Sequence, residues 1–272
     1  ETIREAFAEE LGFAKSNPYK QLVRAMADSF KKGNLAELDR LQAGSDSEKQ
    51  APKLFENIDG IKFLTHQGGC GGTRQDSESL CALLAGYINN PNVAGATVLS
   101  LGCQNAQVDI LHQKLAAINP SFDKTVLVFE QQKSGTEQEL LTEAIKETFK
   151  ALVKANQAER KPAPLSKLTM GLECGGSDGF SGISANPAVG YASDLLVALG
   201  GKTMLAEFPE LCGVEQELIN RCSNEKKAEK FSQLMKSYAS RAEAVGSGFD
   251  MNPSPGNIKD GLITDAIKSA GA

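Results

Sequence analysis

The sequence has no tryptophan and only two histidines among its 272 residues. It also lacks any run of about 18 apolar residues, the length that a membrane-spanning helix needs, so we expect no membrane partner. The net charge is −5, and the lack of a basic patch argues against a nucleic-acid partner. Because the N-terminal residues lack the charged-then-apolar pattern of a signal peptide, we expect a cytoplasmic protein.

Cysteine is sparse as well. Six cysteines are too few for a disulfide scaffold in a chain of this length, and no two are spaced as C-x-x-C. This spacing argues against zinc ribbons and ferredoxin-type clusters, so we expect reduced thiols. The chain starts at Glu1, and its last residues follow a helical pattern with no closing strand, so we expect a piece of a longer protein.

What is present divides into two patterns. Residues 1–57 are highly charged with helical apolar spacing, which predicts a helical lead-in. From residue 58 to 272, short apolar runs alternate with amphipathic helices, which predicts an α/β catalytic domain that is incomplete at the C-terminus. We expect a Rossmann-like parallel sheet of about five strands with helices on both faces, preceded and followed by helical segments. The expected strands are 61–65, 96–101, 125–129, 168–172 and 203–206.

Two of the expected helices carry clear end signals. The sequence TEQE at 136–139 is a capping box that begins one helix. Asn186 and Pro187 form a cap and first-turn pair for a helix over 187–199, and Gly200 with Gly201 supplies its stop.

The segments that follow the expected strands share an unusual composition of glycine, thiol and polar residues. Because ligands bind at the carboxyl ends of parallel strands, we expect these loops to line one cleft. The competing interpretation is that such loops need glycine anyway and that cysteine packs as a small apolar residue. Cys81 and Cys222 lie in helical patterns instead, and we expect them to be buried. The loops are HQGGCGGTR (66–74), GCQN (102–105), EQQ (130–132), ECGGSDGFSG (173–182) and EFPELCG (207–213).

Several common chemistries do not fit these loops. The segment 69–74 lacks the third glycine of a dinucleotide fingerprint, and the second strand ends in Ser100 and Leu101 instead of an acid. No Walker loop is present. A nucleophilic pair of His66 and Cys70 stays open, because spacing in a glycine-rich loop does not define its geometry.

The remaining side chains are carboxylates, amides and soft ligands. This mixture favours Fe(II) or Mn(II) over Mg(II) alone. Glycines beside a helix start expose backbone N–H groups that can hold a substrate carboxylate. A metal, an anion site and a base together can remove a proton α to a carboxylate, because they stabilise the charge that develops.

The motifs THQGGCGGTRQD (65–76), VLSLGCQN (98–105), FEQQ (129–132), ECGGSDGFSGISANPAVG (173–190) and AEFPELCGVEQ (206–216) resemble the altronate dehydratase/galactarate dehydratase family. The resemblance runs from about residue 61 to the end and is closer to the altronate-acting members. It implies a hydro-lyase that removes water from a sugar acid such as D-altronate, leaves a 2-keto-3-deoxy acid and depends on iron or manganese. It also implies a longer enzyme, with a small β-rich domain before this region and further catalytic chain after it.

The positions and chemistry of the residues in these loops give a set of candidate site residues. His66 is either the base or a metal ligand, and Glu173 and Glu207 are candidates for the general acid. The expected substrate contacts are Arg74, Gln104, Asn105, Gln132, Gly175, Gly176, Ser177 and Asp178. The expected metal ligands are His66, Cys70, Cys103, Glu130, Cys174 and Cys212.

Three alternatives stay open. The chain could be a sugar-acid or metal-binding module that is inactive alone, or its substrate could be galactarate. An iron–sulfur cluster on three of the four loop cysteines is the less favoured cofactor. Homodimer formation is also left open.

Overall fold

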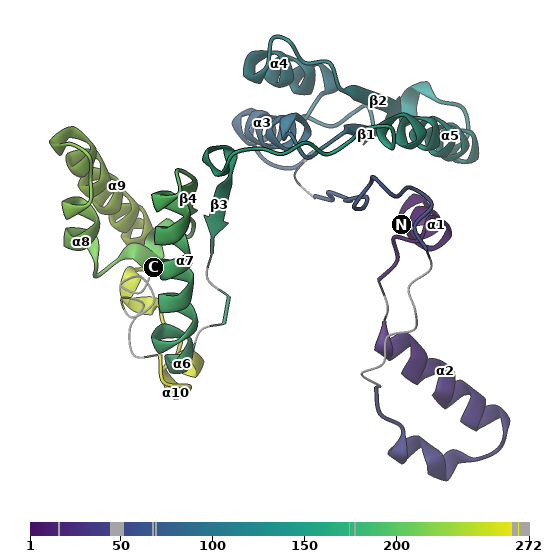
Figure 1. Cartoon of the computed structure of the whole chain (residues 1–272), viewed down its shortest axis with the longest axis horizontal. Coiled ribbons are helices and arrows are strands. Elements are labelled where there is room, and N and C mark those ends of the chain that lie inside the picture. The colour runs from purple at the N-terminus through teal and green to yellow at the C-terminus, as the bar shows by residue number, and fades with distance from the viewer. Residues whose placement is uncertain are drawn as a thin grey trace. The chain divides into compact units, whose positions relative to one another are not determined.

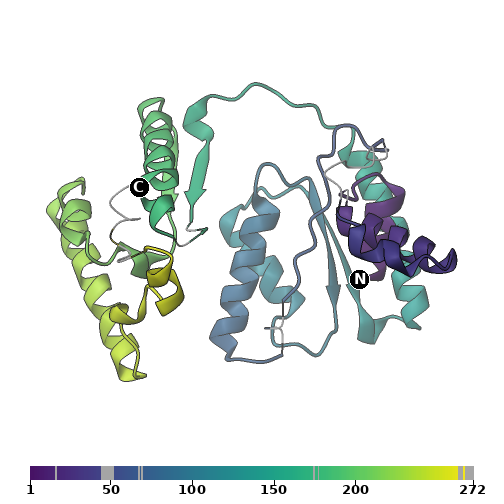
Figure 2. The ribbon, with the colours of Figure 1, turned by 90° about the horizontal axis from the view of Figure 1, so that it is seen from below.

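The computed structural model describes residues 1–15, 17–43, 52–66, 68, 70–173, 175–176, 178–262 and 266. The chain divides into two compact units, Glu1–Arg160 and Lys161–Ala272, shown in Figure 1 and, turned by 90°, in Figure 2. The predicted division into residues 1–57 and 58–272 is a different boundary and stays a prediction. Among the described residues, no helix combines the length and the apolar character needed to cross a membrane.

The first unit places helices on both faces of a two-stranded parallel sheet. Its strands run in register from Gly95 opposite Thr125 to Ser100 opposite Glu130. The elements are α1 (Thr2–Glu10), α2 (Pro18–Lys31), the 3₁₀ turn η1 (Leu35–Arg40), α3 (Arg74–Asn89), β1 (Gly95–Ser100), α4 (Val108–Ile118), β2 (Thr125–Glu130), the 3₁₀ turn η2 (Gln131–Lys133) and α5 (Glu137–Ala155).

Side-chain alternation along β1 explains this layering. Ala96 and Val98 point to one face, where they pack on a core from α3 and α4 that includes Cys81 and Leu111. Thr97 points to the opposite face, where its hydroxyl lies 2.8 Å from that of Thr148 in α5. Figure 2 shows α3 and α4 on one side of the strands and α5 on the other. The predicted covering of both faces is therefore confirmed for this pair of strands.

A second core joins the N-terminal helix to α5. Phe7 of α1 and Leu11, which follows the last residue of this helix, are buried with Phe55, and Ile145 and Leu152 of α5 pack against them. The C-terminal end of α5 is tied to the same segment by two hydrogen bonds: Asn57 donates from its backbone N–H to the Asn156 side chain (3.0 Å) and from Nδ2 to the Asn156 carbonyl (2.8 Å).

The second unit contains another two-stranded parallel sheet, from Thr169 opposite Lys202 to Leu172 opposite Leu205. Helix α7 ends at Ala198, and Gly200 just beyond it has a φ of +90°, the backbone conformation that glycine favours, so the predicted stop is confirmed. The elements are the 3₁₀ turn η3 (Leu165–Lys167), β3 (Thr169–Leu172), α6 (Gly179–Ile183), α7 (Ala185–Ala198), β4 (Lys202–Leu205), the 3₁₀ turn η4 (Phe208–Leu211), α8 (Glu215–Asn220), α9 (Glu225–Ala244), the 3₁₀ turn η5 (Phe249–Met251) and α10 (Pro255–Lys259).

The structure differs from the sequence-based prediction in two respects. The described residues form two sheets of two strands each, not one sheet of five. Residues 61–65 have no regular secondary structure and pair with no described strand, and Phe63 and Leu64 keep 39% and 52% of their surface exposed. An apolar run becomes a strand only where a neighbouring strand supplies hydrogen bonds.

The second difference is that α7 begins at Ala185, so Asn186 and Pro187 lie inside its first turn instead of marking its start. Proline is tolerated there because the first N–H groups of a helix have no partner within the helix.

Candidate active site

The histidine and cysteine loop leads directly into α3. Thr73 caps this helix: its hydroxyl accepts a hydrogen bond from the Asp76 N–H (3.2 Å), and the Asp76 carboxylate accepts one from the Thr73 N–H (2.7 Å). These bonds from the Thr73 backbone and hydroxyl lower the pKa of Asp76. Arg74 is the first residue of the helix and is exposed, as are His66 and Cys70.

The glycines of this loop differ in whether the fold requires them. Gly72 has a φ of +94°, and a Cβ there would lie 2.9 Å from the Asp76 carboxylate, so the cap requires glycine. A Cβ on Gly71 would meet nothing within 4 Å, and one on Gly68 would meet only Leu80 at 3.9 Å. The fold therefore does not require glycine at those two positions. Gly69 lies outside the described residues.

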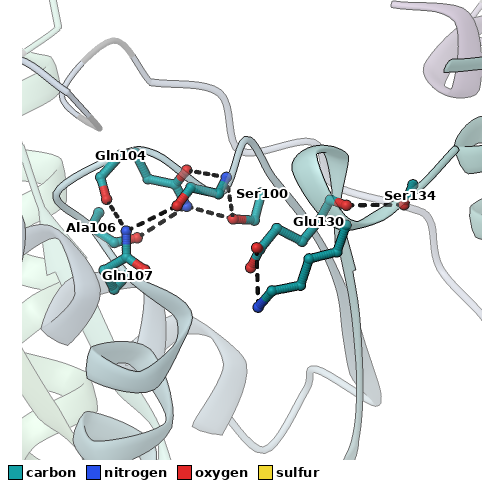
Figure 3. A network of polar contacts seen from close by, with 8 residues as sticks. Ser100, Gln104, Ala106, Gln107, Glu130 and Ser134 are labelled. Atoms are coloured by element: carbon teal, nitrogen blue, oxygen red, sulfur yellow. Dashed lines mark hydrogen bonds and ion pairs between the residues drawn. The ribbon is translucent and has the colours of Figure 1, made fainter. Parts of the chain in front are cut away.

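The loop after β1 is held by side-chain amides. The Gly102 N–H donates to Gln104 Oε1 (2.8 Å) and to Ser100 Oγ (3.2 Å), and Gln104 Nε2 donates to Ser100 Oγ (2.5 Å). Figure 3 shows this network. Gln104 is buried, whereas Cys103 and Asn105 on either side of it are exposed.

The third loop packs against the second. The Glu130 carboxylate, 17% exposed, forms an ion pair with Lys133 (3.1 Å), and its carbonyl accepts hydrogen bonds from the Ser134 N–H (3.1 Å) and hydroxyl (2.9 Å) (Figure 3). Gly102, with a φ of +98°, approaches so closely that a Cβ on it would lie 2.9 Å from Gln132 Oε1 and 3.1 Å from Glu130 Cγ.

Three of the five expected loops therefore lie together in the first unit. The link between the first and second loops is a hydrogen bond from Asn105 Nδ2 to the Cys70 carbonyl, at 3.2 Å. Contacts of Gly102 join the second loop to the third. This grouping follows from parallel pairing, because the carboxyl ends of β1 and β2 meet at the same edge.

The two loops of the second unit are ordered by different contacts. Asp178 caps α6 by accepting a hydrogen bond from the Ser181 N–H (2.8 Å). Gly179 lies against Gly261, since a Cβ on it would be 2.6 Å from the Gly261 carbonyl oxygen. Glu173, Gly175 and Gly176 are exposed, and Cys174 and Ser177 lie outside the described residues.

Glu207 is the residue with a positive φ (+56°) among the described non-glycine residues. It is exposed and precedes η4, and the loop ends in the half-buried Cys212. Left-handed backbone at a non-glycine residue carries strain, which is often retained at functional positions. This conformation is a signal that sequence reasoning cannot find.

A pocket of about 850 Å³ lies within the second unit, beside this loop. Pro209, Cys212, Tyr238 and Arg241 are among its lining residues. The rings of Tyr238 and Phe249, which also lines the pocket, are stacked with centroids 5.9 Å apart. Sequence reasoning had named Cys212 but missed Tyr238 and Arg241, because these two belong to the ordinary amphipathic pattern of α9.

The cysteines divide largely as expected. Cys81 is buried at 2% exposure, and burial raises the pKa of its thiol. Cys222 is half-buried, with its thiol donating to the Leu218 carbonyl (3.4 Å), so it is less enclosed than predicted. Cys70 and Cys103 are exposed thiols on adjoining loops.

The predicted metal ligands do not assemble into a site within the described residues. No group of three or more histidine, cysteine, aspartate or glutamate side chains there is placed to hold a metal ion. Within either unit, the described residues therefore provide no such set of ligands. Iron or manganese binding stays a prediction.

Comparisons with known proteins identify the family. Residues 13–156 match the family model described as D-galactarate dehydratase/altronate hydrolase, second domain. Residues 165–272 match the one described as D-galactarate/altronate dehydratase, C-terminal. The two matches cover most of both units.

Individual relatives agree with these matches. The chain is 38% identical over 214 residues to altronate dehydratase of Bacillus subtilis (strain 168) and 35% identical over 216 residues to altronate dehydratase of Escherichia coli (strain K12). Each alignment covers 79% of this chain and 42% of the relative, so the chain spans less than half the length of these proteins. Galactarate dehydratase (L-threo-forming) of E. coli is 35% identical over 187 residues, which cover 67% of this chain and 36% of that protein. With both units matched and this level of identity, the chain belongs to the D-galactarate dehydratase/altronate hydrolase family.

Proposed function

We propose that the chain is the part of a sugar-acid dehydratase that carries substrate-binding and acid–base residues. The reaction removes water from a sugar acid such as D-altronate and leaves a 2-keto-3-deoxy acid. The observation that carries this proposal is the similarity to two altronate dehydratases over 79% of the chain. The grouping of three polar loops at one edge of the β1–β2 sheet supports it, because such edges bind ligands in parallel sheets.

In the proposed reaction a proton leaves the carbon next to the carboxylate, and the hydroxyl on the neighbouring carbon leaves as water. His66 is the proposed base, since an imidazole accepts a proton near neutral pH without tuning. It is exposed, so substrate can reach it. Glu173 or Glu207 is the proposed acid that donates a proton to the departing hydroxyl; both are exposed.

The role of His66 has a second version, in which it is a ligand of Fe(II) or Mn(II) and a carboxylate is the base. A bound divalent ion would supply Lewis-acid stabilisation of the developing charge. Metal content of purified His66→Ala distinguishes the versions, because only a ligand's removal lowers it.

The structure changes which residues we propose as substrate contacts. Arg74 is exposed at the start of α3, and Asn105 and Gln132 lie on the adjoining exposed loops, so these three stay in the proposal. Gln104 has its amide engaged within its own loop and is withdrawn from it. Gly175, Gly176 and Asp178 lie in the second unit, and a shared site with the first unit stays a prediction.

We also propose that residues 61–65 become a strand of a larger parallel sheet in a chain of the relatives' length. The α5 face of β1 leaves Leu99 52% exposed, and Leu101 just beyond the strand is equally exposed. Parallel sheets are normally covered on both faces, and a two-stranded sheet is marginal alone. A structure of the longer protein in which 61–65 stays unpaired would contradict this.

The decisive experiment is turnover. The purified chain is incubated anaerobically with Fe(II) or Mn(II) and either D-altronate or galactarate, and the 2-keto-3-deoxy acid is measured, with EDTA-treated protein as the control. Formation from altronate in preference to galactarate supports the proposal. Binding without turnover, together with turnover by a chain extended to the relatives' length, supports the alternative of a binding module. If neither the chain nor its extended version binds or converts either sugar acid, the dehydratase proposal and the binding-module alternative are both refuted. Light scattering of the same sample checks homodimer formation.

A further inference from the structure

The side-chain amide of Gln104 is fully engaged by its own loop. Its Oε1 accepts the Gly102 N–H at 2.8 Å, and its Nε2 donates to Ser100 Oγ at 2.5 Å and to the Ala106 carbonyl at 3.4 Å. Only 9% of the residue is exposed. An amide has two N–H donors, and both are directed at protein acceptors here. Gln104 therefore has no donor left for a ligand.

Gln107 closes the same loop from the other side. Its Nε2 donates to the Gly102 carbonyl at 3.3 Å and to the Gln104 carbonyl. Two side-chain amides thus satisfy backbone groups that a loop of this shape cannot pair through regular secondary structure. Figure 3 shows both glutamines facing the loop interior with Ser100.

The two neighbours of the buried Gln104 face outward from the loop. Cys103 and Asn105 are both exposed, and Asn105 Nδ2 donates to the Cys70 carbonyl at 3.2 Å. The conformation of residues 102–106 thus determines whether Asn105 reaches the segment that contains Cys70 and leads to the α3 cap. The hydrogen bonds of the Gln104 side chain all end on Ser100, Gly102 and Ala106, so we expect an effect of Gln104 on the Cys70 segment to pass through the loop.

We propose that Gln104 is a positioning residue that fixes the 102–106 loop so that Asn105 holds the Cys70 segment in place. Its catalytic consequence rests on the proposed function, because a displaced loop would move Asn105 and Cys103 relative to the substrate. The loop-holding role itself does not depend on which reaction the protein catalyses. The competing interpretation is that the network only stabilises its own turn.

The test compares Gln104→Met with Gln113→Met in the whole chain. Methionine keeps the side-chain length but offers neither an N–H donor nor a carbonyl acceptor, and Gln113 is an exposed glutamine of α4 that serves as the matched control. We expect hydrogen exchange of the Gly102 amide to become about tenfold faster in Gln104→Met, since one hydrogen bond is worth roughly that factor. Exchange at residues 70–73 should accelerate as well, whereas β2 and α4 should be unchanged.

Asn105→Ala distinguishes the effect of the Gln104 network on its own loop from the effect of that loop on the Cys70 segment. It should accelerate exchange at residues 70–73 and leave the Gly102 amide as in the wild type, because it removes the bridge but not the amide network. If Gln104→Met unfolds the first unit, the variant Gln104→Glu is used for the test instead. That variant keeps the acceptor for Gly102 but loses both donors, so exchange at 70–73 should still accelerate.

Three outcomes would overturn the proposal. Gly102 exchange equal to that of Gln113→Met would show that the network does not hold the loop. Unchanged exchange at 70–73 in Gln104→Met would show that Gln104 acts only on its own turn. If exchange of the Gly102 amide and exchange at residues 70–73 both accelerate in Gln104→Met while kcat for dehydration is unchanged, the loop does not position the reacting groups.

The expected catalytic result is a fall in kcat of about 10- to 100-fold with a smaller change in KM, as for small misplacements of reacting groups. If the wild-type chain dehydrates no sugar acid, the proposed function fails, and the exchange experiments alone then decide whether Gln104 positions the Cys70 segment.

Discussion

Gly102→Ala tests whether the second and third loops are in direct contact. Gly102 has a φ of +98°, a backbone conformation that side chains other than hydrogen rarely adopt. An added Cβ would also lie 2.9 Å from Gln132 Oε1, 3.1 Å from Gln132 Cβ and 3.1 Å from Glu130 Cγ. The first of these atoms ends a flexible side chain and can move, but the other two lie close to the backbone of the third loop.

The expected magnitude combines the backbone strain with the displaced neighbours. Holding a non-glycine residue in a sparsely populated conformation costs of order 1–3 kcal/mol, so we expect destabilisation of about 2 kcal/mol if the third loop shifts slightly. Gly71→Ala is the matched control, because its φ is not positive and its Cβ would meet nothing within 4 Å. That variant should be unchanged or slightly more stable, since alanine restricts the unfolded chain.

The assay must report on the first unit separately, because a chain of two units need not unfold in one step. Hydrogen exchange of peptides from β1 and α4, followed by mass spectrometry, gives the free energy of opening of this region. Equal free energies for Gly102→Ala and Gly71→Ala would refute the contact between the loops, and with it the grouping of Glu130 and Gln132 beside Gly102.

The other predictions concern the cap, the core and the histidine. Thr73→Ala should destabilise α3 by about 1 kcal/mol, the usual cost of losing a threonine cap, measured by exchange at the start of the helix; no change there would contradict the capping role. Because hydrogen bonds lower the pKa of Asp76 below its ordinary value of 3.8, its contribution is fully present above that pH and is lost as the pH falls through the folded pKa, and Thr73→Ala should weaken this acid sensitivity. Leu115 is 3% exposed, so Leu115→Ala should lower the free energy of opening of α4, measured by hydrogen exchange, by about 2–5 kcal/mol. A negligible change would show that the core around Leu115 is loosely packed. His66→Ala should leave stability within about 0.5 kcal/mol and lower the dehydration rate about 100- to 10,000-fold, and survival of both rate and metal content would remove His66 from the site.

Local sequence patterns predicted the helices and strands well where nearby residues determine the structure. The strands over 96–101 and 125–129 were each predicted to within about one residue, because apolar runs between loops leave few alternatives. The TEQE capping box at 136–139 is present, with both reciprocal hydrogen bonds. The equivalent box from Thr73 to Asp76 was overlooked, although its T-x-x-D pattern is readable in the sequence.

Prediction failed where structure depends on distant partners. Residues 61–65 have the composition of a strand, yet pairing requires a neighbour that sequence composition does not identify. The left-handed backbone of Glu207 is another example, because nothing in the residue type predicts it.

The neighbours Gln104 and Asn105 show a general limit of reading a site from loop composition. Polar residues gather after strands both because ligands bind there and because irregular backbone needs hydrogen-bond partners. Gln104 and Asn105 are adjacent and chemically alike, yet one is buried in its own loop and the other is exposed with its amide on the neighbouring loop. Spacing could not separate them, since only the direction of each side chain decides between the two roles. Among the polar residues of the family motifs, those whose donors are already engaged by protein acceptors are therefore better tested by loop dynamics than by substrate affinity.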